Sequence, residues 1–273
     1  MDYLVPTPHH HGSCTPDSVG CKGAAVAYLH AATPGSRIAG LVTGMPIKHR
    51  CRQPGEYLFR AGDAFHFFHV LHAGFAKTCH LSADGRERTT GFHMRGDILG
   101  LDAVASGTYS CDGVALDACE VLAIPYDAVV EYCQRSPDLV RELHCAFSAE
   151  IRGDRDQMLK LGSLLAEGRV AAFLLEMSAR FGARGFSPTQ LQLRLTRQEI
   201  GSMLALKLET VSRVFSQFAR QGLISVNLRE IVLLDREGLL DIISRPGGRD
   251  RKRRRPARAN PAPGFPGVPA RAA

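Results

Sequence analysis

The 273-residue sequence lacks a long apolar run. No segment approaches the roughly 18 to 20 consecutive apolar residues that a bilayer-spanning helix needs, so a membrane-spanning helix is not expected. The N-terminus also lacks a basic stretch followed by an apolar one, the pattern of a secretory signal. We therefore expect a cytoplasmic protein that makes no membrane contact. In that compartment its eight cysteines are expected to be free thiols or metal ligands rather than disulfides.

Motifs for catalysis are missing as well. The sequence shows no phosphate-binding loop and no nucleophile paired with a base in a suitable context. It therefore argues against an enzyme. At this length the chain can form two modest domains, each with its own core.

The net charge of +7 belongs almost entirely to the C-terminal end. Residues 244–273 hold nine Lys and Arg and one Asp, a net charge of +8, so the rest of the chain carries −1. This Pro- and Arg-rich tail lacks core-forming residues and is expected to be disordered. The charge of the whole chain therefore does not by itself indicate a nucleic-acid partner.

A repeat of 3.5 residues marks the middle of the chain. Ser136-Pro137-Asp138 predicts a helix start, because it supplies a hydroxyl cap, a proline at the first helical position and a carboxylate in the first turn. The seam residues then recur at alternating spacings of three and four: His144, Phe147, Ile151, Asp154, Met158, Leu161 and Leu165. This period is typical of a helix wound about a partner helix. Because no second such run exists, we predict that residues 136–165 pair with the same helix of another copy, mainly through Phe147, Ile151, Asp154, Met158 and Leu161. Packing within its own subunit is the alternative.

Short apolar runs separated by glycines fill residues 46–135, a pattern typical of a β-sandwich or barrel. Asp84-Gly85 between two such runs predicts a hairpin. His66, His69 and His72 resemble a ligand set, but a spacing of three places neighbours on opposite faces of a strand, so structural roles are expected. The preceding residues 1–45 mix Pro, Gly, Ser and His and predict a flexible leader with two cysteines.

Residues 166–243 predict a helix-turn-helix with a β-hairpin wing. A helical period over Leu164–Phe181 ends at Gly182. Thr196 and Glu199 then form a capping box at the start of a short helix. A second helix runs from about Leu208 to Gly222, with one apolar face and one polar face. Two short strands, Leu223–Val226 and Glu230–Leu234, follow as the wing.

This order of regions resembles the cyclic-AMP receptor/FNR family of bacterial transcription regulators over about residues 48–243. The most specific piece is Leu208-Glu209-Thr210-Val211-Ser212-Arg213, which is similar to the E-x-x-S-R recognition helix of the FNR branch. Other similar stretches are Thr90–His93, Gly96–Gly100, Ile151–Asp154 and Arg184–Pro188. The resemblance implies an α+β fold: an N-terminal β-roll of the cupin-like, cyclic-nucleotide-binding type, a long dimerisation helix, and a C-terminal winged helix-turn-helix.

The polar face of the second helix suits DNA. Arg213 can pair with guanine O6 and N7, Glu209 can accept from a cytosine amino group, and Ser212 can reach the neighbouring base or its phosphate. The predicted contacts also include Thr196, Arg197, Lys207 and Thr210. Lys207 stands where many family members have a threonine cap, and it can reach a phosphate. The resemblance implies inverted TTGAT-type half-sites in double-stranded DNA, and RNA polymerase as a partner.

The resemblance also bears on what the first domain senses. The cyclic-AMP branch uses a G-E-L segment and a following Arg-Ser/Thr pair, whereas here the matching runs are Gly100–Ala103 and Gly107–Ser110. They hold no arginine for the phosphate, so cyclic AMP is not expected.

The oxygen-sensing FNR branch binds a [4Fe-4S] cluster through N-terminal cysteines that include C-x-x-C, plus one strand cysteine. This chain offers Cys14 and Cys21, an incomplete set, and Leu122 at the strand position. Cys111 and Cys119 lie an odd number of residues from Leu122 and are expected on the other face of the strand. A rearranged cluster site, inert thiols and a cysteine-oxidation switch stay open as alternatives.

We therefore predict a homodimeric, DNA-binding transcription regulator of the FNR type, an activator of low-oxygen or redox-responsive genes. One alternative is an effector-binding β-roll subunit that regulates an enzyme. Another is an FNR-type regulator that is switched by cysteine oxidation or by its expression level rather than by an iron–sulfur cluster.

Overall fold

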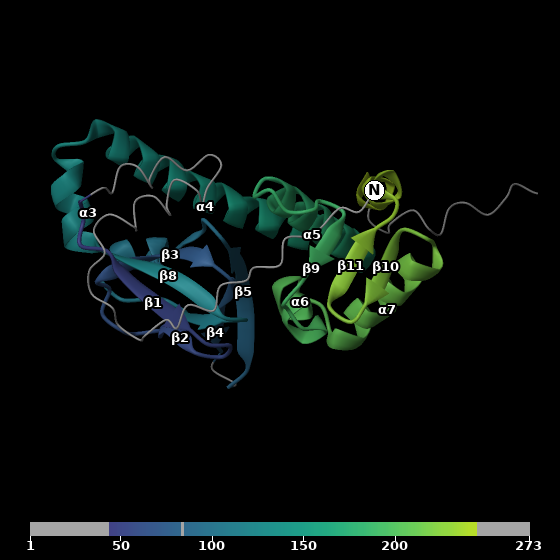
Figure 1. Cartoon of the computed structure of the whole chain (residues 1–273). Coiled ribbons are helices and arrows are strands. Elements are labelled where there is room, and N and C mark those ends of the chain that lie inside the picture. The colour runs from purple at the N-terminus through teal and green to yellow at the C-terminus, as the bar shows by residue number, and fades with distance from the viewer. Residues whose placement is uncertain (1–43, 83–84, 245–273) are drawn as a thin grey trace, which may run out of the picture.

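The computed structural model describes residues 44–82 and 85–244. The predicted flexible leader (except residues 44 and 45) and the basic tail (except residue 244) lie outside the described residues. Figure 1 shows a β-rich domain and a C-terminal domain side by side, with the long helix α4 running along the first and leading into the second. Among the described residues, no helix is both long and apolar enough to cross a bilayer.

Two four-stranded antiparallel sheets form the β-rich domain. One has the order β1-β8-β3-β6 and the other β2-β7-β4-β5. The strands are β1 Lys48–Arg52, β2 Tyr57–Phe59, β3 Phe67–Ala73, β4 Phe75–Leu81, β5 Glu87–Met94, β6 Ile98–Leu99, β7 Asp112–Ala115 and β8 Cys119–Pro125, with a 3₁₀ helix, η1 Leu101–Val104, after β6. The predicted β-roll is therefore confirmed, and its core is apolar, with Leu71 and Leu122 fully buried.

The predicted hairpin joins β4 and β5. These strands pair in an antiparallel register that extends from Phe75 opposite Met94 to Leu81 opposite Glu87. Gly85, in the connection, has a positive φ of 75°, a backbone conformation that glycine adopts without steric cost. Asp84, the other residue of the predicted turn, lies outside the described residues.

Helix α4, Pro137–Ser163, follows the short helix α3, Tyr126–Cys133. It begins as predicted, because the Ser136 side chain accepts a hydrogen bond from the backbone N–H of Leu139 and Pro137 occupies the first turn. Its first half packs on the β-roll, where Leu139 is buried and Phe147 is partly buried. The seam further along is uncovered in the single chain, and Ile151 and Met158 are 51% and 73% exposed.

The helix ends two residues before the predicted boundary, so the seam residue Leu165 lies outside it. Leu164 and Leu165 are both extended, and α5, Ala166–Gly182, starts after them. Arg169 of α5 stabilises this break. Its guanidinium donates to the carbonyl oxygens of Leu161 at 2.6 Å and of Leu164 at 3.0 Å, which satisfies acceptors that a helix end leaves open.

The C-terminal domain continues from α5 through β9 Gln190–Gln192, α6 Arg197–Met203, α7 Leu208–Arg220, β10 Ile224–Asn227, β11 Glu230–Leu233 and α8 Arg236–Ser244. Strands β10 and β11 form the predicted wing hairpin, and β9 adds a third strand in the order β10-β11-β9. Strand β9 and helix α8 were not predicted. The buried residues of α5, α6 and α7 form one core with those of the wing.

Candidate nucleic-acid interface

The first helix of the helix-turn-helix, α6, begins at the predicted capping box. The Thr196 hydroxyl accepts from the backbone N–H of Glu199 at 3.2 Å, and the Glu199 carboxylate accepts from the backbone N–H of Thr196 at 2.7 Å. The hydroxyl of Thr196 also donates to the same carboxylate at 2.8 Å. Thr196 is exposed but its hydroxyl is already hydrogen-bonded, so its first role is to start α6.

A tight turn separates α6 from α7. The N–H of Leu206 donates to the carbonyl of Gly201 at 2.8 Å, and Ala205 has a positive φ of 52°. A Cβ at position 201 would lie 2.7 Å from the carbonyl oxygen of Leu206, closer than such atoms can approach. Glycine at 201 therefore allows the chain to bring the two helices together.

Helix α7 has one buried side and one open side. Val211, Val214, Phe215 and Phe218 are buried in the domain core. On the opposite side the predicted base-reading residues Glu209, Ser212 and Arg213 are exposed, as is Lys207, while Thr210 is partly buried. Lys207 is the N-cap residue and makes no side-chain cap, as expected from its missing hydroxyl. The structure thus brings the predicted contacts of α7 onto one exposed face.

Arg197 is placed differently from the others. Its guanidinium lies 3.7 Å from the centroid of the Phe215 ring, a cation–π contact that joins α6 to α7. Burial lowers the pKa of this side chain, which is only partly exposed. Arg197 therefore stabilises the packing of the two helices in addition to any contact it makes with DNA.

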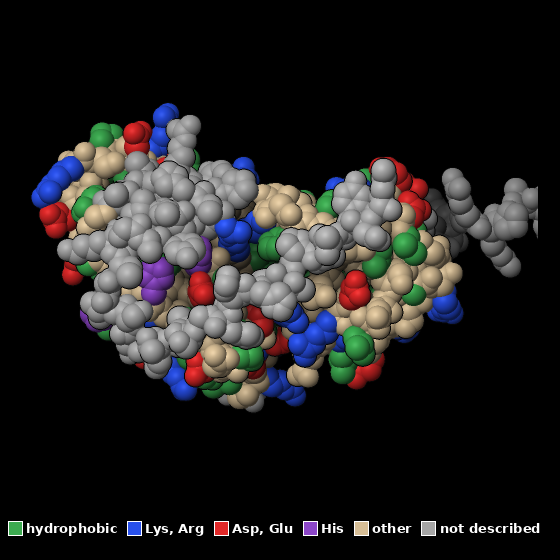
Figure 2. All heavy atoms as spheres, viewed as in Figure 1, with side chains coloured by type: hydrophobic (Ala, Val, Ile, Leu, Met, Phe, Trp, Pro, Cys, Tyr) green, Lys and Arg blue, Asp and Glu red, His purple; other side chains and the backbone are tan. Residues whose placement is uncertain are grey.

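Charge is mixed on the surface. On the part of the face in Figure 2 that the described residues occupy, Lys and Arg side chains alternate with Asp and Glu and form no continuous basic surface. This face therefore gives no broad basic surface for a nucleic-acid backbone.

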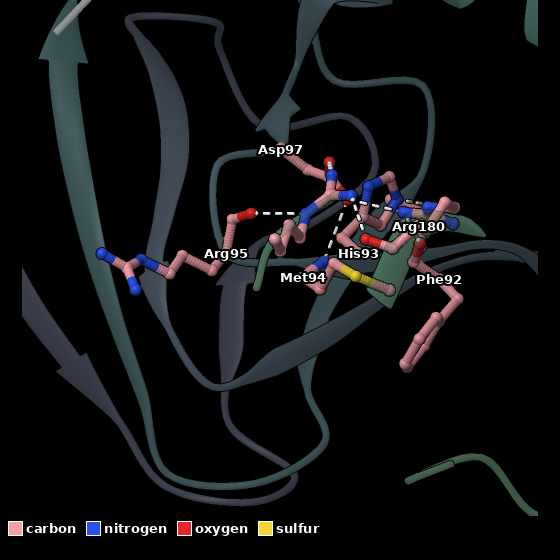
Figure 3. A network of polar contacts seen from close by, with 8 residues as sticks. Phe92, His93, Met94, Arg95, Asp97 and Arg180 are labelled. Atoms are coloured by element: carbon pink, nitrogen blue, oxygen red, sulfur yellow. Dashed lines mark hydrogen bonds and ion pairs between the residues drawn. The ribbon is translucent and has the colours of Figure 1, made fainter. Parts of the chain in front are cut away.

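Several FNR-like stretches that are distant in sequence meet in one polar network (Figure 3). Asp97, in the turn after β5, pairs with Arg180 of α5 at 2.6 Å and with Arg184. Arg180 also donates to the carbonyl of Phe92 at 2.8 Å, and Arg184 to that of Arg95 at 2.7 Å. This network holds the C-terminal domain against the β-roll. The contacts of this network were not predicted from the sequence, although the stretches Gly96–Gly100 and Arg184–Pro188 stood out as motifs.

Where the cyclic-AMP branch holds its nucleotide, this chain pairs its own side chains. The Ser110 hydroxyl donates to the carboxylate of Asp102, and Tyr109 is buried beneath them. Within these two matching runs, no arginine accompanies the carboxylate to neutralise a phosphate. That cyclic AMP does not bind stays a prediction from the sequence.

Three of the described thiols are buried and protonated in this structure, whereas an iron–sulfur cluster is held by thiolates. Burial raises the pKa of Cys111 and of Cys119 to about 11 and that of Cys79 to about 12, so all three remain protonated at neutral pH. The Cys119 thiol also donates to the carbonyl of Phe75 at 3.0 Å, and Leu122 is fully buried. In the described part of the chain, no three His, Cys, Asp or Glu residues are grouped so that they could hold a metal. Cys14 and Cys21 lie outside the described residues.

Cys111, Cys51 and the two histidines of β3 are placed as follows. Cys111 precedes β7 and does not share a strand with Leu122, which lies on β8, so the predicted opposite-face relation applies only to Cys119. Cys51 is disulfide-bonded, contrary to the expectation of free thiols, since sequence spacing does not show which cysteines come close in space. His69 is buried and its Nε2 lies 3.1 Å from the Tyr109 hydroxyl, whereas His72 lies 3.9 Å from Glu120.

Comparison with known proteins agrees with this architecture. Residues 50–136 match the model of the cyclic nucleotide-binding domain, and residues 168–242 match that of the Crp-like helix-turn-helix domain. The chain is 41% identical over 192 residues to the transcriptional activator protein anr of Pseudomonas aeruginosa, covering 70% of this chain and 77% of the relative. It is 35% identical over 190 residues to the fumarate and nitrate reduction regulatory protein of Escherichia coli strain K12, covering 70% and 76%.

A solved structure is similar along the same length. The structure of FixK2 from Bradyrhizobium japonicum superposes with a TM-score of 0.67 at 28% identity, covering 73% of this chain and 98% of that one. Both domain models, the relatives and the described fold thus agree, and the chain belongs to the FNR branch of the cyclic-AMP receptor/FNR family of DNA-binding transcription regulators.

Proposed function

We propose that the chain acts in the cytoplasm as a homodimeric, sequence-specific transcription activator that reads DNA with α7. The observation that carries this proposal is the polar face of α7. Glu209, Ser212 and Arg213 are exposed together while the opposite side of the helix is buried in the domain core. Arg213 would pair with a guanine, Glu209 with a cytosine amino group, and Ser212 with the adjacent base or phosphate.

Dimerisation through α4 is the second part of the proposal. Ile151 and Met158 expose apolar side chains at seam positions, and Asp154 between them is also exposed. A two-fold axis along this seam would cover the apolar surface of both chains and place two α7 helices on one side of the dimer. Phe147 and Leu161, which are partly buried within the chain, would contribute their remaining exposed surface.

The DNA site follows from the dimer. Two identical recognition helices related by a two-fold axis require an inverted repeat, and the family motif favours TTGAT-type half-sites. Bound there, the regulator would recruit RNA polymerase. Thr196, Arg197, Lys207 and Thr210 surround the reading residues and are proposed to position the domain on the backbone.

The test is a fluorescence anisotropy titration at fixed salt, with an inverted TTGAT duplex and a duplex of the same composition in scrambled order. We expect binding to the inverted repeat to be tighter by a factor of about 10³ or more. Equal affinity for the two duplexes would contradict the proposal. It would favour an effector-binding subunit that regulates an enzyme.

The genes under control are proposed to serve low-oxygen or redox adaptation. This follows the relatives, one of which is named for fumarate and nitrate reduction. Because the sequence lacks a C-x-x-C pair and has Leu122 at the strand position, protein that is purified without oxygen should be colourless and should bind DNA equally before and after air is admitted. About four irons and four sulfides per chain, a number that follows from a [4Fe-4S] cluster, together with a brown colour that air bleaches, would overturn this expectation.

A further inference from the structure

One buried charge joins the sensor domain to the DNA-binding domain outside the Asp97 network. Lys77 lies on β4 and is only 9% exposed. Its ammonium donates to Glu87 of β5 at 2.5 Å and to Glu199 of α6 at 2.7 Å. Glu199 is 122 residues away in sequence, so this contact exists only because α6 is docked on the β4–β5 hairpin (Figure 1).

Both partners are charged in this contact. Burial disfavours the ammonium of Lys77, but the hydrogen bonds and charges of Glu199 and Glu87 outweigh it and raise its pKa. Burial likewise disfavours the carboxylate of Glu199, yet Lys77 and Thr196 outweigh it and lower its pKa. The pair is therefore an ion pair at neutral pH, screened from solvent on the lysine side.

Glu199 does two things at once. One carboxylate oxygen, Oε1, accepts from Lys77, and the other, Oε2, accepts from the backbone N–H of Thr196 in the capping box. The same group thus fixes the start of the first helix of the helix-turn-helix and ties that start to the sensor domain.

Two neighbouring contacts hold the rest of α6. The buried Thr89 of β5 donates its backbone N–H to the hydroxyl of Ser202 at 2.9 Å. On the other side, the side-chain amide of Gln157 in α4 donates to the carbonyl of Met203 at 2.9 Å. Helix α6 is therefore held between the β-hairpin and the proposed dimerisation helix, while the polar face of α7 stays open.

We propose that Lys77 is a positioning residue for DNA recognition, which acts through Glu199 to fix the orientation of the helix-turn-helix relative to α4. In a dimer built on α4, this orientation sets the distance and angle between the two α7 helices, and hence the half-site spacing that fits. If the orientation of the helix-turn-helix is fixed before DNA binds, less conformational entropy is lost on binding. The inference rests on the proposed function, because it concerns how the same interface is presented.

The experiment compares Lys77→Met, Glu199→Gln and the double variant. Glutamine keeps the capping box, since its side-chain oxygen accepts from the Thr196 N–H, so Glu199→Gln removes the ionic contact and spares the helix start. Glu131→Gln is the matched control, because it breaks the exposed pair of Glu131 on α3 with Arg135, at the end of the β-rich domain away from α6. Each protein is titrated with the inverted repeat at its preferred spacing and with duplexes in which one central base pair is added or removed.

We expect each single variant to bind the preferred duplex roughly threefold to tenfold more weakly, in the range for coupling between charges in contact. Affinity for the duplexes with an altered spacing should change less. The ratio of the two affinities, preferred spacing over altered spacing, should therefore fall by a similar factor. The double variant should bind the preferred duplex no more weakly than the single variant with the lower affinity. The control should bind it as the wild type does. Urea unfolding verifies that Glu199→Gln remains folded, which keeps the test valid if Lys77→Met does not fold.

Two results would overturn the inference. Undiminished spacing discrimination in Glu199→Gln would show that the pair does not set orientation. An equal loss of affinity for every duplex would show a merely structural role. Failure of the proposed function itself looks different, because the wild type would then discriminate neither sequence nor spacing.

Discussion

Asp97, in the turn between β5 and β6, accepts a hydrogen bond from Arg180 of α5 over 2.6 Å. The contact joins the sensor domain to the DNA-binding domain across 83 positions of sequence. Arg184, in the turn just after the end of α5, pairs with the other oxygen of the same carboxylate. A single carboxylate thus holds one arginine of α5 and one arginine of the turn that follows this helix.

Asp97→Asn should destabilise the chain, because two partly buried guanidinium groups lose their counter-charge. We expect a loss of about 2 to 3 kcal/mol in the free energy of unfolding, as for hydrogen bonds to charged groups. Urea unfolding followed by circular dichroism measures it. Glu131→Gln, which breaks an exposed pair, is the control and should lose at most about 1 kcal/mol. Equal effects of the two substitutions would mean that the Asp97 network does not hold the domains together.

Arg213→Ala should remove base reading and leave attraction to phosphates. The expected loss is about 1 to 3 kcal/mol of discrimination per half-site, while binding to random DNA persists. A gel-shift titration on specific and random duplexes gives both affinities. If Arg213 served only as a phosphate contact, the substitution would weaken both duplexes equally.

Asp154→Ala should strengthen the dimer. Two carboxylates that meet about 4 Å apart at the axis repel by about 4 kcal/mol at an effective dielectric of 20. Burial of each apolar seam residue stabilises the dimer by about 1.5 to 3 kcal/mol. The repulsion in the one charged layer therefore offsets the burial of one or two apolar layers. Removing it should give tighter dimers and transcription without the signal. Sedimentation equilibrium tests this, and unchanged or weaker dimerisation would mean that Asp154 turns outward or pairs with Arg155 of the other chain.

Stability should fall as the pH drops below about 6.5. Burial lowers the pKa of His69 to about 3 and that of His93 to about 4, whereas both take up a proton near 6.5 in the unfolded chain. Below 6.5 the unfolded state therefore binds more protons than the folded state, and protonation favours unfolding. Urea unfolding at several pH values between roughly 7.5 and 5, a range that brackets the pKa of histidine in the unfolded chain, should show the free energy of unfolding fall. His69→Phe should make the decline shallower and leave the part due to His93, while substitution of the exposed His80 by Gln should not change it. A pH-independent wild type would contradict this account.

Local signals predicted the starts of helices well. Ser136 and the Thr196–Glu199 box are encoded by three or four adjacent residues, and both caps are confirmed. The end of α4 was harder to predict, because Leu164 and Leu165 continue the apolar pattern. The break depends on Arg169, whose guanidinium takes up the carbonyls left open at the helix end. The residues adjacent to Leu164 and Leu165 give no sequence signal for the end of the helix.

Contacts between the domains could not be predicted from periodicity or capping. The sequence assigns Glu199 to a capping box and gives Lys77 no role, and only docking of the domains makes them partners. The open face of α7 was predictable, because its polar and apolar residues already separate at helical spacing. What the sequence could not supply is how that face is held relative to α4.

The most direct test of the account is the number of chains on each duplex. Sedimentation velocity of wild-type protein should be run with a duplex that carries two inverted TTGAT half-sites and with one that carries a single half-site beside scrambled sequence. We expect a complex of two chains per duplex on the inverted repeat, formed at concentrations at which the duplex with a single half-site stays free. A complex of one chain per duplex, or equal binding to both duplexes, would contradict the claim that a dimer built on α4 reads DNA with two α7 helices.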